Sequence, residues 1–375
     1  MKKNIALIGT DLIDPALTDY LCHLRDNFDC LVTLYASKNR VLDKFVAAGI
    51  VGRKLYLPNF DKKFAVALFI IFLPIWYIPA FLFVLFLKIK MIETIITVNV
   101  YEKILFTPLA AIFKIKNVWL ECPNADFGRA NIIIKKLYLF FSTRATLLTF
   151  TRPAQKQLLD LGIKPEAIVK ILPAIKLNNF QRQENIFSKI AKSEQVGRIN
   201  KFFNLATVID MHRSNKFETM FKSVRNCLTV VPNLQLIIIG EGPDKKNLTW
   251  LAKKMEIDNL VWFVGEQNFL RKWLETVHVY IYTDKTLRLQ AITALLHALS
   301  VGLPVIGPKD IGLDDIICEN KNGCLVVPDD DEDLSQAIIK LRQNRRLYQI
   351  MSENSKIIAE NFSLDKSVQK IIEYI

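Results

Sequence analysis

The amino-acid sequence predicts an α/β protein with two tandem Rossmann-like domains, each built on a parallel sheet with helices between its strands. Short apolar runs alternate with helical stretches along the first 180 residues, and the alternation begins again near residue 200. Residues 181–199, between the two series, are polar and show no hydrophobic periodicity, which favours a linker. With 375 residues, 51% of them hydrophobic, the chain is long enough to form two cores.

The first half contains four clear strand signals, with helical stretches between them. Continuous apolar runs predict strands at residues 4–9, 30–35, 95–98 and 118–120, and residues 15–26 have a helical pattern. Because helical stretches separate the strands, we expect a parallel sheet with crossover helices.

The second half repeats this organisation. The patterns predict strands at 202–209, 235–239, 260–264 and 279–282. They predict helices at 217–231 and 248–255, between the first three of these strands. From Tyr280 to Gly307 the chain then reads as strand, loop, amphipathic helix, Gly-x-Pro turn and buried strand. An α/β domain that holds a nucleotide at the carboxyl ends of its strands uses this order of elements.

The charge distribution argues against a nucleic-acid partner. The net charge is +13, and residues 51–150 alone carry 13 Lys/Arg against 5 Asp/Glu. These cations alternate with long apolar runs and not with aromatic RNA-binding signatures, which favours an anionic membrane surface. The six cysteines lie far apart without a C-x-x-C pair, which indicates reduced thiols in a cytosolic protein.

Residues 64–87 form an apolar segment of 24 residues without a charge, flanked by lysines. Fully helical, it would measure about 36 Å, against about 30 Å for a bilayer core. A crossing would separate the strands before it from those after it, and Pro74 and Pro79 are expected to divide the helix. Two interpretations remain: a segment that contacts the membrane from one side, or a buried crossover helix. The helical stretch 131–144 mixes basic and apolar residues and supports the first.

Four motifs follow one another in the second half at regular distances. In order they are Gly240-Glu241-Gly242-Pro243, Val261-x-Phe263-x-Gly265, Gly302-x-Pro304-Val305-Ile306 and Asn322-Gly323-x-Leu325-Val326. The series resembles the donor domain of retaining GT-B glycosyltransferases of the family-4, or group 1, type.

The resemblance covers residues from about 150 to the end and implies a division of the chain. Residues 1–180 would form the acceptor-side domain, 181–199 the linker, 200–360 the nucleotide-sugar donor domain, and 361–375 a helix that crosses back to the first domain.

The resemblance also implies a donor pocket. Lys216 matches the family's lysine on the leaving diphosphate, whereas the arginine position falls on Met211, with Arg213 near enough to substitute. Both cations are alternatively solvated loop charges. The resemblance assigns the shape of the nucleotide pocket to Gly240, Glu241, Gly242 and Gly302.

The family's two donor-site glutamates, eight positions apart, are replaced in this sequence by Leu289 and His297. The later glutamate holds ribose hydroxyls in the family, and His297 still donates or accepts a hydrogen bond there. Leu289, at the position that contacts the donor sugar, has no polar atom to offer. His297 is alternatively a packed, hydrogen-bonded helix residue.

Two acidic positions are candidates on the acceptor side. Glu121 follows the strand at 118–120, where the family often has a histidine, and is a candidate catalytic carboxylate. Asp11 or Asp14, after the first strand, would orient an acceptor hydroxyl as a base or would cap the next helix. Residues 329–331, three aspartates, start a helix in this interpretation, and no metal is expected.

The sequence thus predicts a retaining, metal-independent glycosyltransferase. It would use a UDP- or GDP-linked sugar as co-substrate, with no cofactor, and a glycan or polyprenyl-linked acceptor, as in bacterial surface polysaccharide assembly. We expect it in the cytoplasm, peripherally or monotopically associated with the inner face of the cell membrane. Because Leu289 and His297 replace the two glutamates, the alternative is a catalytically inactive GT-B protein that scaffolds or activates a partner transferase.

Overall fold

The structure is a computed structural model of the chain, and it divides into two compact units. The first unit contains Met1–Pro173, Arg288–Gln290 and Leu364–Ile375, and the second contains Ala174–Leu287 and Ala291–Ser363. The described residues are 3–9, 14, 16–37, 39–55, 69–121, 132–177, 202–209, 211, 217–267, 269–284, 287–309 and 312–375. The expected linker at 181–199 lies outside them.

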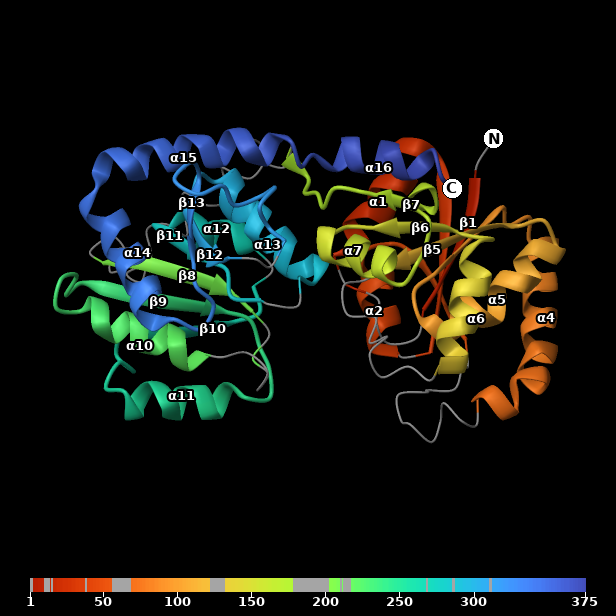
Figure 1. Cartoon of the computed structure of the whole chain (residues 1–375), viewed down its shortest axis with the longest axis horizontal. Helices are drawn as coiled ribbons and strands as arrows, with labels where there is room; N and C mark the ends of the chain where they lie inside the picture. Colours follow the sequence, from red (N-terminus) through yellow and green to blue (C-terminus); the bar gives the residue numbers. More distant parts are fainter. Residues whose placement is uncertain are drawn as a thin grey trace. The chain divides into compact units, whose positions relative to one another are not determined.

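The first unit is built on a seven-stranded parallel sheet with the order β3-β2-β1-β4-β5-β6-β7 (Figure 1). Its strands are β1 (Lys3–Ile8), β2 (Cys30–Ala36), β3 (Val51–Lys54), β4 (Thr94–Thr97), β5 (Lys116–Glu121), β6 (Thr146–Thr149) and β7 (Ile168–Lys170). All four predicted strands are confirmed, and they lie in one sheet. The three strands that the sequence did not predict are the shorter β3, β6 and β7, whose apolar runs are brief.

Helices cover the first sheet. They are α1 (Leu17–Phe28), α2 (Asn39–Ala47), α4 (Leu73–Ile89), α5 (Val100–Ile112), α6 (Ile132–Ser142), α7 (Arg152–Asp160), the 3-10 turn η1 (Pro165–Ala167) and α16 (Leu364–Ile372). The predicted helices at 15–26 and 131–144 are confirmed as α1 and α6. Helices α4, α5 and α6 lie side by side (Figure 1).

Helix α4 contains most of the apolar segment and connects β3 to β4. Because both strands belong to one sheet, the argument against a simple crossing is confirmed. Within the residues that the structure describes, no helix is long and apolar enough to cross a membrane. Pro74 lies in the first turn, but the helix continues through Pro79, so the prediction that both prolines divide it is wrong. Residues 64–68 of the segment lie outside the described residues.

Tyr77 of α4 compensates for a proline in the neighbouring helix. Pro108 lies inside α5 and has no backbone N–H to donate to the carbonyl four residues earlier, that of Ile104. The hydroxyl of Tyr77 donates to this carbonyl oxygen at 3.1 Å. Burial raises the pKa of Tyr77 to about 12, so the hydroxyl keeps its proton for this bond. The contact fixes α4 against α5.

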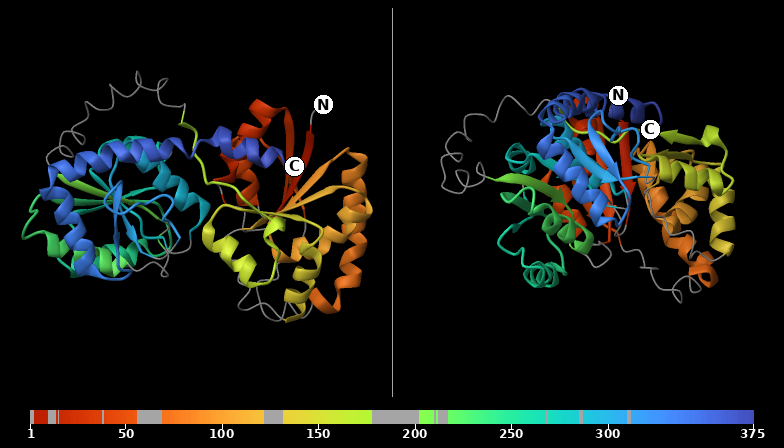
Figure 2. Two further views of the ribbon diagram at one scale, coloured as in Figure 1. Left: turned by 45° about the horizontal axis from the view of Figure 1, so that its top comes forward. Right: turned by 60° about the vertical axis from the view of Figure 1, so that its left-hand side comes forward.

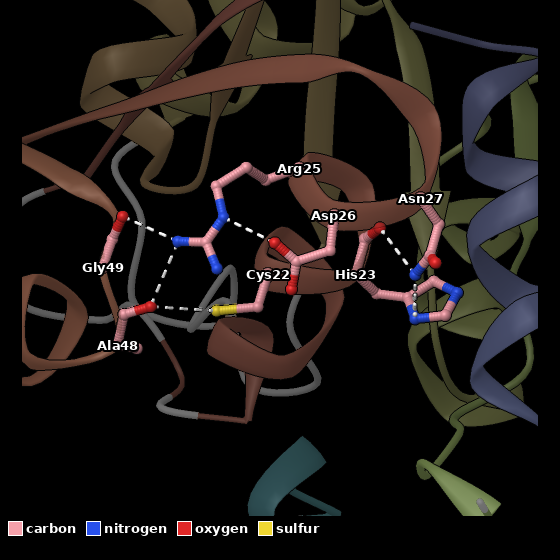
Figure 3. A network of polar contacts seen from close by, with 7 residues as sticks. All are labelled: Cys22, His23, Arg25, Asp26, Asn27, Ala48 and Gly49. Atoms are coloured by element: carbon pink, nitrogen blue, oxygen red, sulfur yellow. Dashed lines mark hydrogen bonds and ion pairs between the residues drawn. The ribbon is translucent and has the colours of Figure 1, made fainter.

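Polar contacts anchor α1 to the turn that follows α2 (Figure 3). The guanidinium of Arg25 donates to the carbonyls of Gly49 and Ala48, at 2.7 and 3.3 Å. A Cβ on Gly49 would lie 2.7 Å from the same guanidinium, and its φ of 80° favours glycine. On the opposite side of α1, His23 Nε2 lies 2.9 Å from the carboxylate of Asp365 in α16, which packs against α1 (Figure 2).

The second unit is built on a six-stranded parallel sheet with the order β10-β9-β8-β11-β12-β13. Its strands are β8 (Phe203–Val208), β9 (Leu234–Ile239), β10 (Val261–Gly265), β11 (Val279–Ile281), β12 (Val305–Pro308) and β13 (Gly323–Val326). Its helices are α10 (Phe217–Cys227), α11 (Lys245–Lys254), α12 (Leu270–Glu275), α13 (Leu289–Ser300), α14 (Asp331–Gln343) and α15 (Arg345–Glu360). The first two residues of α13, Leu289 and Gln290, are grouped with the first unit. Every strand and helix predicted for this half is confirmed.

Both faces of the second sheet are covered. Side chains of α10, α11 and α14 form one apolar cluster with the sheet, and side chains of α12, α13 and α15 form another. A parallel sheet buried on both faces explains why its strands are continuous apolar runs in the sequence. The expected α/β class with two tandem Rossmann-like halves is thereby confirmed.

The Asn322-Gly323 motif has a structural explanation. Asn322 is fully buried, and its side chain accepts from the amide of Cys318 at 2.7 Å and donates to the carbonyl of Ile316 at 2.8 Å. A Cβ on Gly323 would lie 2.2 Å from the carbonyl oxygen of Val305 in the neighbouring strand. The motif therefore closes the turn before β13 against β12.

The Tyr77–Ile104 contact leads to a prediction for a double-mutant cycle. Tyr77→Phe should lower the free energy of unfolding by about 1 kcal/mol, because it leaves a carbonyl oxygen without a donor. In a Pro108→Ala background residue 108 regains its N–H, so the same change should cost little. Urea denaturation of the four proteins measures both steps. An equal cost in the two backgrounds would contradict this explanation of the Tyr77 hydroxyl.

Candidate functional site

The strand order places a topological switch point between β8 and β11 of the second unit. Chain connections leave these neighbouring strands in opposite directions, which opens the carboxyl edge of the sheet for a ligand. The hydroxyls of Thr207 and Thr283 lie 3.4 Å apart across this point, and Asp284 beside them is buried. Sequence reasoning missed all three. Their position in the sequence could have indicated them, because Thr283 and Asp284 closely follow the strand β11 and so lie at its carboxyl end.

Gly240 and Gly242 pack backbone against backbone at this edge. Gly240 has a φ of 139°, and a Cβ on it would lie 2.1 Å from the carbonyl oxygen of Ile209. A Cβ on Gly242 would lie 2.4 Å from the carbonyl oxygen of Met211. Only glycine fits at these two positions, because the loop after β9 lies directly on the segment that follows β8. The two glycines therefore shape the edge, and a contact with a donor stays a prediction.

Glu241, between the two glycines, has an exposed side chain. Its carboxylate lies 2.9 Å from Nζ of Lys245 in the first turn of α11, and its carbonyl accepts from the amide of Met211 at 3.1 Å. The side chain of Met211, at the family's arginine position, is fully buried in the apolar core. Met211 therefore offers no charge to a diphosphate. Arg213 and Lys216 lie outside the described residues, and their roles stay predictions.

Helix α13 carries Leu289 and His297, the two positions that the resemblance predicts to correspond to the family's glutamates. Leu289 begins the helix and is buried, and His297 lies about 12 Å further along the axis. Burial, with a smaller contribution from the Arg271 charge, lowers the pKa of His297 to about 4. The imidazole is therefore neutral at pH 7, with one donor and one acceptor nitrogen.

Gly302 lies at the other end of α13, away from the carboxyl edge. Its amide donates to the carbonyl of Leu299, and the next amide, of Leu303, donates to that of Ala298. With a φ of 83°, Gly302 is the left-handed residue that ends the helix. Since α13 is about 18 Å long, this position does not support the predicted contact between Gly302 and the nucleotide.

Glu121 lies in the first unit, at the carboxyl end of β5, and is buried in an ion pair. Its Oε1 lies 2.8 Å from Nζ of Lys103 and accepts from the hydroxyl of Tyr138 at 2.7 Å. Lys103 Nζ also donates to the carbonyl of Leu120. Burial and the Glu121 charge raise the pKa of Tyr138, so this phenol stays protonated. The cluster joins β5 to α5 and α6, and a catalytic role for Glu121 stays a prediction.

Asp14 has the contacts of a cap. Its Oδ1 accepts from the amide of Ala16 at 2.9 Å, and its Oδ2 accepts from the amide of Gln290, a residue of the same unit, at 3.0 Å. Burial raises the pKa of Asp14, while these hydrogen bonds act in the opposite direction. The capping interpretation fits this geometry. Asp11, the other candidate base, lies outside the described residues.

A small apolar pocket also opens at the carboxyl edge of the second sheet. Its volume is about 60 Å³. The pocket lies on the side of the sheet that α10 and α14 cover. Its lining includes Ile209, Phe217, Tyr282, Gly307, Pro328 and Leu334. Small-molecule sites usually measure about 300–1,000 Å³, so this pocket alone does not hold a sugar nucleotide.

Comparisons with known proteins identify the family. Residues 184–357 match the family described as glycosyl transferases group 1. An uncharacterized glycosyltransferase of Haemophilus influenzae is 25% identical over 270 residues, which are 71% of this chain and 71% of that protein. One of Methanocaldococcus jannaschii is 27% identical over 225 residues, 55% of this chain and 57% of that protein. Residues 184–357 of this chain therefore have the sequence of a group 1 glycosyltransferase domain.

A solved structure extends the likeness of this glycosyltransferase to the whole fold. The crystal structure of Anabaena HepE in complex with UDP superimposes with a TM-score of 0.78, at 14% identity, over 100% of this chain and 99% of that one. The GT-B fold expected from the order of the motifs is confirmed.

The buried pair in this glycosyltransferase leads to a second prediction. Glu121→Gln leaves the Lys103 ammonium buried without a counter-charge and should lower the free energy of unfolding by about 3–5 kcal/mol. Replacing both residues, with Lys103→Met and Glu121→Gln, removes the stranded charge and should restore most of the loss. Chemical denaturation of the three variants measures the coupling. A double variant as unstable as the sum of the single variants would contradict the pairing.

His297 leads to a prediction about pH. Its pKa in the folded protein, about 4, is below the ordinary 6.5, so the unfolded chain takes up a proton first as the pH falls. The stability that neutral His297 maintains is complete above pH 6.5, and about 2 kcal/mol of it should be lost at pH 5. His297→Gln should remove this part of the pH dependence in urea denaturation at pH 7.5 and pH 5. Identical pH profiles for both proteins would contradict a half-buried imidazole that stays neutral.

Proposed function

We propose that this glycosyltransferase transfers a sugar from a UDP-linked donor, with retention at the anomeric carbon and without a metal ion. The observation that carries the proposal is the position of the switch point, inside the segment that matches the group 1 family. The structure of Anabaena HepE, which shares the fold, was solved in complex with UDP and with UDP-glucose, which supports UDP over GDP. The acceptor in this proposal is a glycan or a polyprenyl-linked glycan at the cytoplasmic face of the membrane.

Cleavage of the donor leaves negative charge on the diphosphate, which a cation stabilises. In the sequence Arg213 and Lys216 follow β8 and precede α10, next to the switch-point strand. We assign both to the diphosphate. Met211 stands at the position that the resemblance gives to the family's arginine, and it is buried in the core. In the proposal, the positive charge for the diphosphate therefore comes from Arg213 and Lys216.

The donor contacts on α13 are reduced in this chain. In the proposal, neutral His297 takes the ribose role of the later glutamate through a single hydrogen bond, a weaker contact than a carboxylate makes. Leu289 supplies only apolar surface. The buried apolar Leu289 and Met211 favour a second candidate function, that of an inactive GT-B protein that supports a partner transferase.

Nucleotide binding tests the proposal. UDP at ten times its Kd should stabilise the protein by about 1.4 kcal/mol and raise the Tm by roughly 3–6 °C. Lys216→Ala should remove this shift in differential scanning fluorimetry. The matched control is Lys222→Ala, on the exposed face of α10, where the lysine pairs with Glu218 at 3.0 Å. This variant should keep the shift.

Two outcomes separate the candidates. If neither UDP nor GDP, alone or as UDP-glucose and GDP-mannose, raises the Tm at millimolar concentration, the transferase proposal fails. If UDP-glucose binds but no sugar reaches water or an added glycan over a long incubation, the supporting role is favoured.

A further inference from the structure

Helix α4 has apolar side chains on two opposite faces. Ala80, Val84 and Leu87, spaced by four and three residues, are buried against the sheet and α5. A second stripe has the same helical spacing on the outer face and is formed by Ile75, Ile78, Leu82 and Ile89. These four side chains are 59%, 65%, 61% and 70% exposed. The outer stripe therefore stays in contact with solvent in the folded chain.

The neighbouring helix extends this apolar surface. A groove of about 390 Å³ lies between α4 and α5. It is lined by Ile78, Phe81 and Leu82 of α4 and by Pro108, Leu109 and Ile112 of α5, among others. Ile112 is 67% exposed. We call the outer stripe and this groove together the α4–α5 face. The ribbons of α4 and α5 lie side by side in the first unit (Figure 1).

Lysines gather at one end of the α4–α5 face. Both helices connect consecutive parallel strands, so they run in the same direction and end at the same edge of the sheet. Lys88 and Lys90 lie at the end of α4, and Lys114 and Lys116 follow α5, all exposed. From 73 to 87 α4 carries no charge, and Glu93 is the acidic residue exposed near this end. The surface is thus an apolar face with a cationic rim.

We propose that the α4–α5 face docks this protein in plane on an anionic lipid bilayer. The outer stripe enters the boundary between headgroups and acyl chains, the groove receives acyl-chain segments, and the four lysines contact lipid phosphates. A second copy of this chain would present the same excess of lysines, so its charges do not complement the rim, whereas those of anionic lipids do. The inference deepens the membrane location proposed above, but it depends on the surface of the first unit and not on sugar transfer.

Vesicle sedimentation with the full chain tests the apolar part. The protein should sediment with vesicles of 70% phosphatidylcholine and 30% phosphatidylglycerol at 0.1 M salt. Ile78→Asp with Leu82→Asp should weaken this binding at least tenfold, because two carboxylates would enter the acyl boundary. The matched control is Ile357→Asp on α15 of the second unit, where the side chain is 60% exposed. It should bind like the unaltered protein.

The lysines are tested separately. Replacing Lys88, Lys90 and Lys114 with glutamine should reduce the preference for phosphatidylglycerol vesicles over pure phosphatidylcholine at least tenfold. Three exposed lysines of α11, changed together to glutamine, form the control with the same change of net charge: Lys246, Lys253 and Lys254. This control should keep the preference, because its charges belong to the second unit and are not part of the α4–α5 face.

Three results would overturn the docking proposal. One is no sedimentation with anionic vesicles, and another is equal binding of the Ile78/Leu82 variant and the Ile357 control. The third is a dimer in analytical ultracentrifugation that the Ile78/Leu82 variant abolishes in the absence of lipid, since a second copy would then cover the face. The UDP-induced Tm shift, measured on the same proteins, confirms their folding. It also separates the two proposals, because a UDP-induced shift in an unaltered protein that does not bind anionic vesicles would refute only the docking.

Discussion

The parallel pairing of one central strand with two neighbours is the constraint on which both units depend. β1 pairs with β2 and β4, and β8 pairs with β9 and β11. Parallel neighbours need long crossovers, so each pairing requires helices, and these bury both faces of the sheet. The same pairing sends successive connections in opposite directions and creates the switch point where a ligand binds. Fold and candidate site therefore have one physical origin.

The same constraint explains the apolar segment. Because β3 and β4 must share one sheet, the chain between them begins and ends on one side of any membrane. One face of α4 is used by the core, and its second apolar stripe has no counterpart inside the described part of the first unit. An ordinary crossover helix is polar on its outer face. The apolar outer face of α4 is thus a feature of this unit that the fold itself does not require.

Several conspicuous motif residues have structural reasons that are independent of a ligand. Gly240 and Gly242 permit a close backbone approach, Gly302 ends a helix, and Asn322 closes a turn. The order of such motifs identifies the family because it reports the donor-domain fold. It says less about catalysis, which depends on a few side chains, and the roles predicted for Leu289 and His297 stay predictions.

The sequence by itself determined most of the strands, the α/β class and the resemblance to the family, but not the short strands β3, β6 and β7. Continuous apolar runs are required where a sheet is buried on both faces, and this requirement is visible residue by residue. Only the tertiary structure decided which partners the polar residues have. Lys103 and Glu121 form their pair because β5 lies beside α5 in the folded unit. Gly302 ends α13 because the chain must turn there before it enters β12. The outer stripe of α4 is likewise distinguished from its inner stripe only by the sheet that covers one of them. Such contacts join residues that are distant in the sequence, and no local pattern encodes them.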